Sequence, residues 1–93
     1  MPAAARVGVD AAAGVIIGPG EPTVTVNGSV IAVEADNVTP HGSDPPHSSS
    51  PKLVPGAGSQ TVTAGGKNVF RQGDPATCGH NVTSGSGNVT VGG

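Results

Sequence analysis

The amino-acid sequence predicts an all-β fold: a small, conical, pseudo-three-fold body of short strands and hairpins. Three observations predict it. Thr and Val alternate on either side of Gly-containing turns, as in half-buried strands. Gly and Pro together make 25 of the 93 residues, a density that interrupts any helical period. One Phe and no Trp or Tyr leave too few large side chains for a conventional core.

The clearest local pattern is a β-hairpin. Residues 23–26 alternate with period two, Asn27-Gly28 is a favourable two-residue turn, and residues 29–33 follow as the return strand. The same design recurs 38 residues later, and its register holds from Asp36 to Asp74. The second copy consists of a strand at 61–64, the turn Gly65-Gly66 and a return strand at 67–71.

A third copy of the repeat is divided between the two ends of the chain. Residues 88–93 match the first strand and turn, and residues 6–10 supply the return strand. Repeats this short cannot bury a face alone, so we expect one closed domain over residues 1–93 with its ends in contact. A Gly-x-Gly step precedes the first strand of each copy, at Gly18-Pro19-Gly20, Gly56-Ala57-Gly58 and Gly85-Ser86-Gly87.

Variable loops follow the Asp residue of each repeat, and two of them hold every His and Cys of the chain. The loop at 37–52 is the longest and reads as an insertion. If equivalent loops emerge at one end of the body, four ligands meet there, the number that a closed tetrahedral Zn²⁺ site needs. Iron suits the same ligands. The alternative to a metal site is a set of exposed histidines with a buried thiol. The four candidate ligands are His41, His47, Cys78 and His80.

Charge and hydropathy exclude several classes of function. Four basic residues spread along the chain do not form a nucleic-acid patch. The longest apolar run covers residues 15–17, too short to span a membrane. The N-terminus lacks the layout of a signal peptide, so we expect synthesis in the cytoplasm. A single cysteine, Cys78, excludes an internal disulfide.

Three segments together resemble the PAAR-repeat proteins: residues 2–10 (Pro-Ala-Ala-Ala-Arg-Val-Gly-Val-Asp), the hairpin at 23–28, and residues 69–74 before a Cys/His loop. The resemblance implies a non-enzymatic β-structured spike tip, with one monomer capping a trimeric VgrG-like or tail-spike protein. Such tips serve type VI secretion systems, contractile phage tails and related injection machines. They are ejected with the spike and contact the target outer membrane transiently. The resemblance also implies a structural zinc ion near the apex, held by three His and one Cys.

The sequence departs from the family pattern in two ways. The motif has an extra Ala, and Val9 is inserted between Gly8 and Asp10. The family often places a His shortly after the first Asp, whereas residues 11–14 here are Ala-Ala-Ala-Gly. We therefore expect the long second loop to supply two ligands, His41 and His47.

Two other functions compete with the spike tip. One is a free-standing small metal-binding protein. The other is an enzyme, either a metallohydrolase or a protein that pairs Cys78 with a histidine as nucleophile and base. Four protein ligands would close the coordination position that a metallohydrolase needs. The sequence leaves open which contractile machine, which metal and which target cell are involved, and whether an effector docks on the tip.

Overall fold

The computed structural model describes residues 2–40 and 51–92, and within these ranges the regular elements are short β-strands without a helix. The predicted all-β class is therefore confirmed. The strands are β1 (Ala11–Ala12), β2 (Gly14–Gly18), β3 (Glu21–Val26), β4 (Ser29–Ile31), β5 (Asn37–Val38), β6 (Thr63–Ala64) and β7 (Lys67–Asn68).

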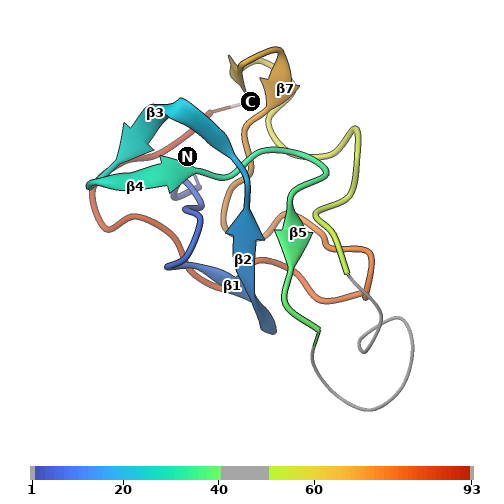
Figure 1. Ribbon diagram of the computed structural model, residues 1–93. Helices are drawn as coiled ribbons and strands as arrows, with labels where there is room; N and C mark the ends of the chain where they lie inside the picture. The colour runs from blue at the N-terminus through green and yellow to red at the C-terminus, as the bar shows by residue number, and fades with distance from the viewer. Residues whose placement is uncertain (1, 41–50, 93) are drawn as a thin grey trace.

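Both predicted hairpins are present, as β3–β4 and β6–β7, and they lie at one end of the molecule (Figure 1). The return strands are shorter than predicted. Strand β4 ends at Ile31, because Val33 turns away and pairs with Val69 of the other hairpin copy. The three-stranded sheet β1-β2-β5 lies toward the opposite end.

A closed ring of three backbone hydrogen bonds lies at the centre of the fold. Ala32 N–H donates to the carbonyl of Ala5, Ala5 N–H to that of Phe70, and Phe70 N–H to that of Ala32, each over 3.0 Å. All three residues are completely buried. A ring of this kind requires three chain segments arranged about one axis, so the backbone itself has pseudo-three-fold symmetry.

Further contacts repeat around this axis. The residue two positions after each ring residue donates its N–H to a carbonyl of the adjacent repeat: Val7 to Val30 (2.8 Å), Glu34 to Asn68 (2.9 Å) and Gln72 to Ala3 (2.9 Å). The three repeat-equivalent Asp residues each close a turn by accepting a backbone N–H at 2.9 Å: Asp10 from Arg6, Asp36 from Val33 and Asp74 from Arg71.

The two ends of the chain pair with each other. Val91 N–H donates to the carbonyl of Pro2 over 2.8 Å, and Ala4 N–H donates to that of Val89 over 2.9 Å. Ala3 forms an antiparallel bridge with Thr90 between these two bonds. The terminal segments thereby contribute one side of the three-fold body.

The structure corrects the register of the third Gly-x-Gly step. Ser86 Oγ accepts the N–H of Val89, as Ser59 Oγ accepts that of Val62. Gly85 is therefore equivalent to Gly58, and Gly87, which faces open space, is not part of the step. A Cβ at Gly85 would lie 3.0 Å from two carbonyl oxygens, and one at Gly58 2.8 Å from the carbonyl oxygen of Val69.

The buried side chains form two layers along the axis, each built from repeat-equivalent residues. The layer near the loops contains Ala5, Ala12, Ile16, Ala32, Val38, Leu53, Phe70, Ala76, Cys78 and Val82. The layer near the hairpins contains Ala4, Val26, Ile31, Val33, Ala64, Val69 and Val91. Small residues predominate because three strands converge on a narrow axis, which explains how a chain with one aromatic residue still has a core.

Candidate functional site

The three variable loops emerge together, at what we call the loop end. Thr77 N–H donates to the carbonyl of Lys52 over 2.7 Å, and Lys52 N–H donates to Thr77 Oγ1 over 3.0 Å. Thr39 N–H donates to the carbonyl of Val15 over 2.9 Å. The stem of the second loop therefore contacts the third loop and Val15, the residue that directly follows the first loop.

That stem is itself closed by two contacts. Val38 N–H donates to the carbonyl of Pro51 over 2.8 Å, and Lys52 Nζ donates to Asn37 Oδ1 over 2.6 Å. The predicted ligands His41 and His47 follow the first half of this stem and lie outside the described residues. Their positions remain predictions.

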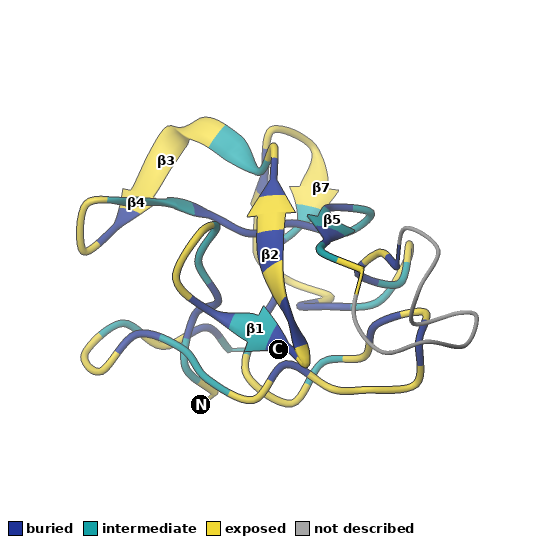
Figure 2. Ribbon diagram, turned by 60° about the horizontal axis from the view of Figure 1, so that its bottom comes forward, coloured by how far each residue is buried: buried dark blue, intermediate teal, exposed yellow. Residues whose placement is uncertain are grey.

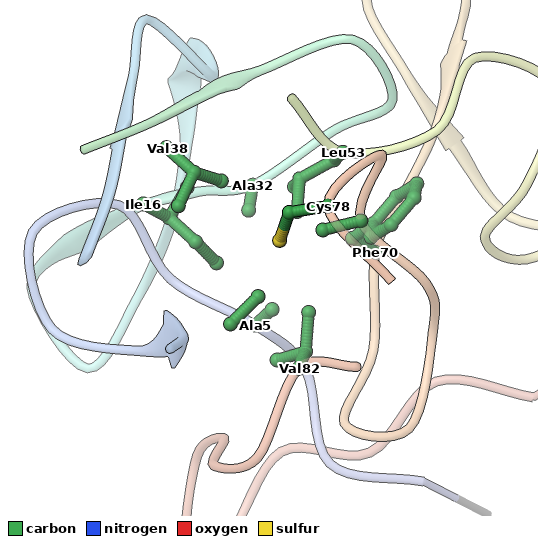
Figure 3. Packing of buried hydrophobic residues seen from close by; sticks show 10 residues of the cluster. Ala5, Ile16, Ala32, Val38, Leu53, Phe70, Cys78 and Val82 are labelled. Atoms are coloured by element: carbon green, nitrogen blue, oxygen red, sulfur yellow. The ribbon is translucent and has the colours of Figure 1, made fainter. Parts of the chain in front are cut away.

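Cys78, the third predicted ligand, is buried. Its exposed fraction is 6%, and its sulfur points into the apolar layer among side chains that include Ile16, Val38 and Leu53 (Figure 3). These apolar surroundings suit a thiol, because a free Cys packs as a small hydrophobic residue. The side chain therefore has a packing role whether or not it also binds a metal.

His80, the fourth predicted ligand, is exposed and shares a tight loop with Cys78. Ala76 N–H donates to the carbonyl of His80 over 2.8 Å, and Gly79 supplies a positive φ of 90° between the two candidates. The loop thus carries one donor on its buried side and one on its solvent side.

Within residues 2–40 and 51–92, no three His, Cys, Asp or Glu side chains gather as a metal site would require. Two of the four predicted ligands lie outside those ranges, so the four-ligand site remains a prediction. The donor chemistry suits it: one loop offers a thiol and an imidazole, and the stem of the loop with two more imidazoles contacts it.

The opposite end, which we call the hairpin end, exposes three repeat-equivalent segments, the first of which belongs to β3. Residues 22–25 and 60–63 are exposed throughout, and residues 87–90 are exposed except for the half-buried Val89. Figure 2 shows this exposure along most of β3. Val24 and Val62 occupy the same repeat position and are 37% and 40% exposed. One chain thus presents three repeat-equivalent exposed segments around one axis.

The three turn-closing carboxylates differ in their electrostatic surroundings. Burial raises the pKa of Asp10, but hydrogen bonds from Arg6 and Ser84 outweigh it, so that pKa lies below its ordinary value. Asp36 has Val33 where the other repeats have Arg. Burial raises the pKa of Asp36 above its ordinary value, although the N–H groups of Val33 and Gly20 oppose the rise.

A comparison with protein families shows to which family this chain belongs. The family described as PAAR motif matches residues 9–84, which is most of the 93-residue chain. The chain belongs to the PAAR motif family. The resemblance to this family is confirmed: the match includes the segments 23–28 and 69–74, whereas residues 2–8 lie before it. A comparison with curated proteins found no match.

Membership in the PAAR family implies a spike-tip component of contractile injection systems, and the family is structural in character. Such components are assembled on a spike and leave the cell with it. In the described parts of this PAAR protein, no helix has the length and hydropathy needed to cross a membrane.

Sequence reasoning located the Asp anchors and the loops of this PAAR protein, but missed two features. The burial of Cys78 could not be predicted from the sequence, since its neighbours in the core come from distant segments. The contacts of Asn27 with Ser86 and Asn88 were not anticipated, because these residues are 59 and 61 positions away. No periodicity in the sequence signals either feature.

Proposed function

We propose that this PAAR protein is the tip of a contractile injection machine, with the hairpin end docked on a trimeric VgrG-like or tail-spike protein. The observation that carries the proposal is the set of three repeat-equivalent exposed segments, 22–25, 60–63 and 87–90, around the hydrogen-bond ring. One monomer can offer each of three identical spike chains a similar surface.

The exposed backbone and Val side chains of these three segments favour docking over exposure to solvent. Unpaired strand edges and exposed Val side chains promote association with other β-structure. Between Glu21 and Thr25 the ladder of β3 with β4 shifts register, so residues 22–24 have no partner in the register of β4. A β-structured spike end would cover this backbone together with Val24 and Val62. The loop end then faces outward and meets the target envelope transiently.

A charged side chain at the hairpin end is expected to weaken docking. Val62→Glu should raise the dissociation constant for the cognate trimeric spike at least about tenfold, because the carboxylate would be desolvated on binding. Titration calorimetry with the purified spike measures this. Ile17→Glu is the matched control: Ile17 is 52% exposed and lies on β2, outside the three exposed segments. A larger effect from Ile17→Glu would contradict the docking face.

The proposal includes a structural metal ion at the loop end, Zn²⁺ or iron, held by His41, His47, Cys78 and His80. Support comes from the donor set and from the contact between the stem of the second loop and residue 77. When bound, the metal would cross-link the two loops where few side chains are available to pack. His41 and His47 would anchor the long loop, and Cys78 would connect the site to the core.

Cys78→Val separates metal binding from packing, because Val fills the apolar position and cannot ligate a metal. We expect elemental analysis to give one zinc or iron per wild-type monomer and none for Cys78→Val. The unfolding midpoint should fall by about 10 °C, the shift that about 2 kcal/mol causes in a domain of this size. A variant that retains its metal would make Cys78 a core residue only. Asn81→Ala, at an exposed position of the same loop, serves as the control and should keep the metal.

A further inference from the structure

The turn of the β3–β4 hairpin contains a sequence with its own chemistry. Asn27 and Gly28 are both exposed and have φ values of 53° and 83°. An asparagine before glycine is prone to ring closure, since the glycine nitrogen is unhindered by a side chain. No atom lies within 4 Å of the position that a Cβ on Gly28 would take. The other asparagines all precede Val, whose branched side chain hinders such attack: Asn37, Asn68, Asn81 and Asn88.

The side-chain amide of Asn27 is held by the segment of the chain that follows the third loop. Its Nδ2 donates to Asn88 Oδ1 over 2.9 Å, and its Oδ1 accepts from Ser86 Oγ. Ser86 is 4% exposed, and its Oγ accepts the N–H groups of Asn88 and Val89 at 3.2 and 3.0 Å. Both polar atoms of the Asn27 amide are therefore fixed by residues anchored in the neighbouring repeat. We call this arrangement the Asn27 clamp.

We propose that Asn27 is a deamidation site whose reaction is gated by the Asn27 clamp. When the clamp opens, the Gly28 nitrogen gives its proton to water and attacks Asn27 Cγ. The bond from Cγ to Nδ2 breaks, and ammonia leaves after taking a proton from water. Water then opens the cyclic imide at either carbonyl and yields Asp or isoaspartate. One water is consumed and one ammonia released, with no oxidant or reductant.

The product cannot rebuild the same clamp. A carboxylate at position 27 sets an acceptor oxygen against Asn88 Oδ1 and removes a hydrogen bond. Isoaspartate also adds a methylene to the backbone of a two-residue turn, where Val26 and Ser29 are the closing pair. Deamidation would therefore release the hairpin from the segment that pairs with the N-terminus, and the change would be irreversible without a repair enzyme.

Peptide mass mapping after incubation at mildly alkaline pH tests this proposal. We expect the peptide with Asn27 to gain about 1 Da, and the peptides with the four Asn-Val pairs to stay unchanged. Ser86→Ala should speed the reaction about tenfold, because the Asn27 amide loses its hydrogen bond from Ser86 Oγ and the backbone of Asn88 loses its anchor. Ser86→Thr keeps a hydroxyl and should restore the slow rate. Gly28→Ala should slow the reaction in every background.

Two comparisons keep the test independent of general destabilisation. Asp74→Asn lowers stability without touching the Asn27 clamp and should leave the rate at Asn27 unchanged. Wild-type protein in urea should react at least as fast as Ser86→Ala. Equal rates in folded wild type and Ser86→Ala, or no reaction at Asn27 in urea, would overturn the proposal.

Discussion

Gly20→Ala is expected to prevent folding at physiological temperature. A Cβ on Gly20 would lie 2.5 Å from the carbonyl oxygen of Ile31 and 2.7 Å from a methyl of Val30, so the backbone itself would have to move. The φ of Gly20 is 66°, which adds about 1–2 kcal/mol for an L-residue. Overpacking adds about 1–3 kcal/mol, and the sum approaches the roughly 5 kcal/mol at the low end of domain stability.

Gly66→Ala is the matched control for this prediction. Gly66 has a φ of 82°, but no atom lies within 4 Å of its added Cβ. The Gly66→Ala variant should therefore lose only the stability that a left-handed backbone conformation costs an L-residue, about 1–2 kcal/mol. Urea unfolding followed by circular dichroism measures both variants. Equal losses would mean that the close approach between repeats at Gly20 does not stabilise the body.

Asp10→Asn is expected to cost about 3 kcal/mol at neutral pH, the usual loss when one member of a buried ion pair is removed. Asp10 Oδ2 lies 2.8 Å from Arg6 Nε, and the two side chains are 2% and 16% exposed. Asp10 also accepts the Ser84 hydroxyl over 2.9 Å. The variant leaves a guanidinium without its counter-charge beside the carbonyl of Gly85, which Arg6 Nη2 contacts over 3.3 Å.

The pH dependence of this loss follows from the direction of the pKa shift. The pKa of Asp10 is lowered in the fold from an ordinary value of 3.8. Its stabilising contribution is therefore present above that value and is lost as pH falls through the folded pKa. The difference between wild type and Asp10→Asn should shrink in strong acid. Asp36 acts in the opposite direction: its pKa is raised, so its contribution is present in acid and declines as pH rises.

Asp74→Asn supplies the comparison within the same fold. The Arg71–Asp74 pair spans 3.0 Å, and its side chains are 14% and 13% exposed, so water compensates part of the loss. Arg71 also keeps the carbonyls of Gly92 and Gly58 as acceptors. We expect a cost of about 1 kcal/mol, as for a partly solvated pair. A larger loss for Asp74→Asn than for Asp10→Asn would contradict the ranking by burial.

The hairpins and the Asp anchors could be predicted from the sequence because local rules govern them. Period-two alternation and the turn at Asn27-Gly28 are readable from neighbours, and the 38-residue register identified Asp36 and Asp74. The ring through Ala5, Ala32 and Phe70 could not be predicted, since backbone hydrogen bonds between repeats leave no trace in side-chain identity.

The candidate site was harder to predict from the sequence for a related reason. Whether Cys78 faces the core or the surface depends on where Ile16 and Leu53 pack, and neither is near it in sequence. The third Gly-x-Gly step was misplaced because Gly85 and Gly87 look alike in the sequence, and only the contact of Gly85 with residues 3 and 4 distinguishes them.

The most direct test of the proposed docking is the stoichiometry of the complex with the cognate trimeric spike, measured by native mass spectrometry. One chain with three repeat-equivalent exposed segments should occupy all three spike chains at once. We predict one PAAR monomer for each spike trimer, even when the PAAR protein is in large excess. Three monomers bound per trimer would contradict the proposal that one chain docks on all three spike chains.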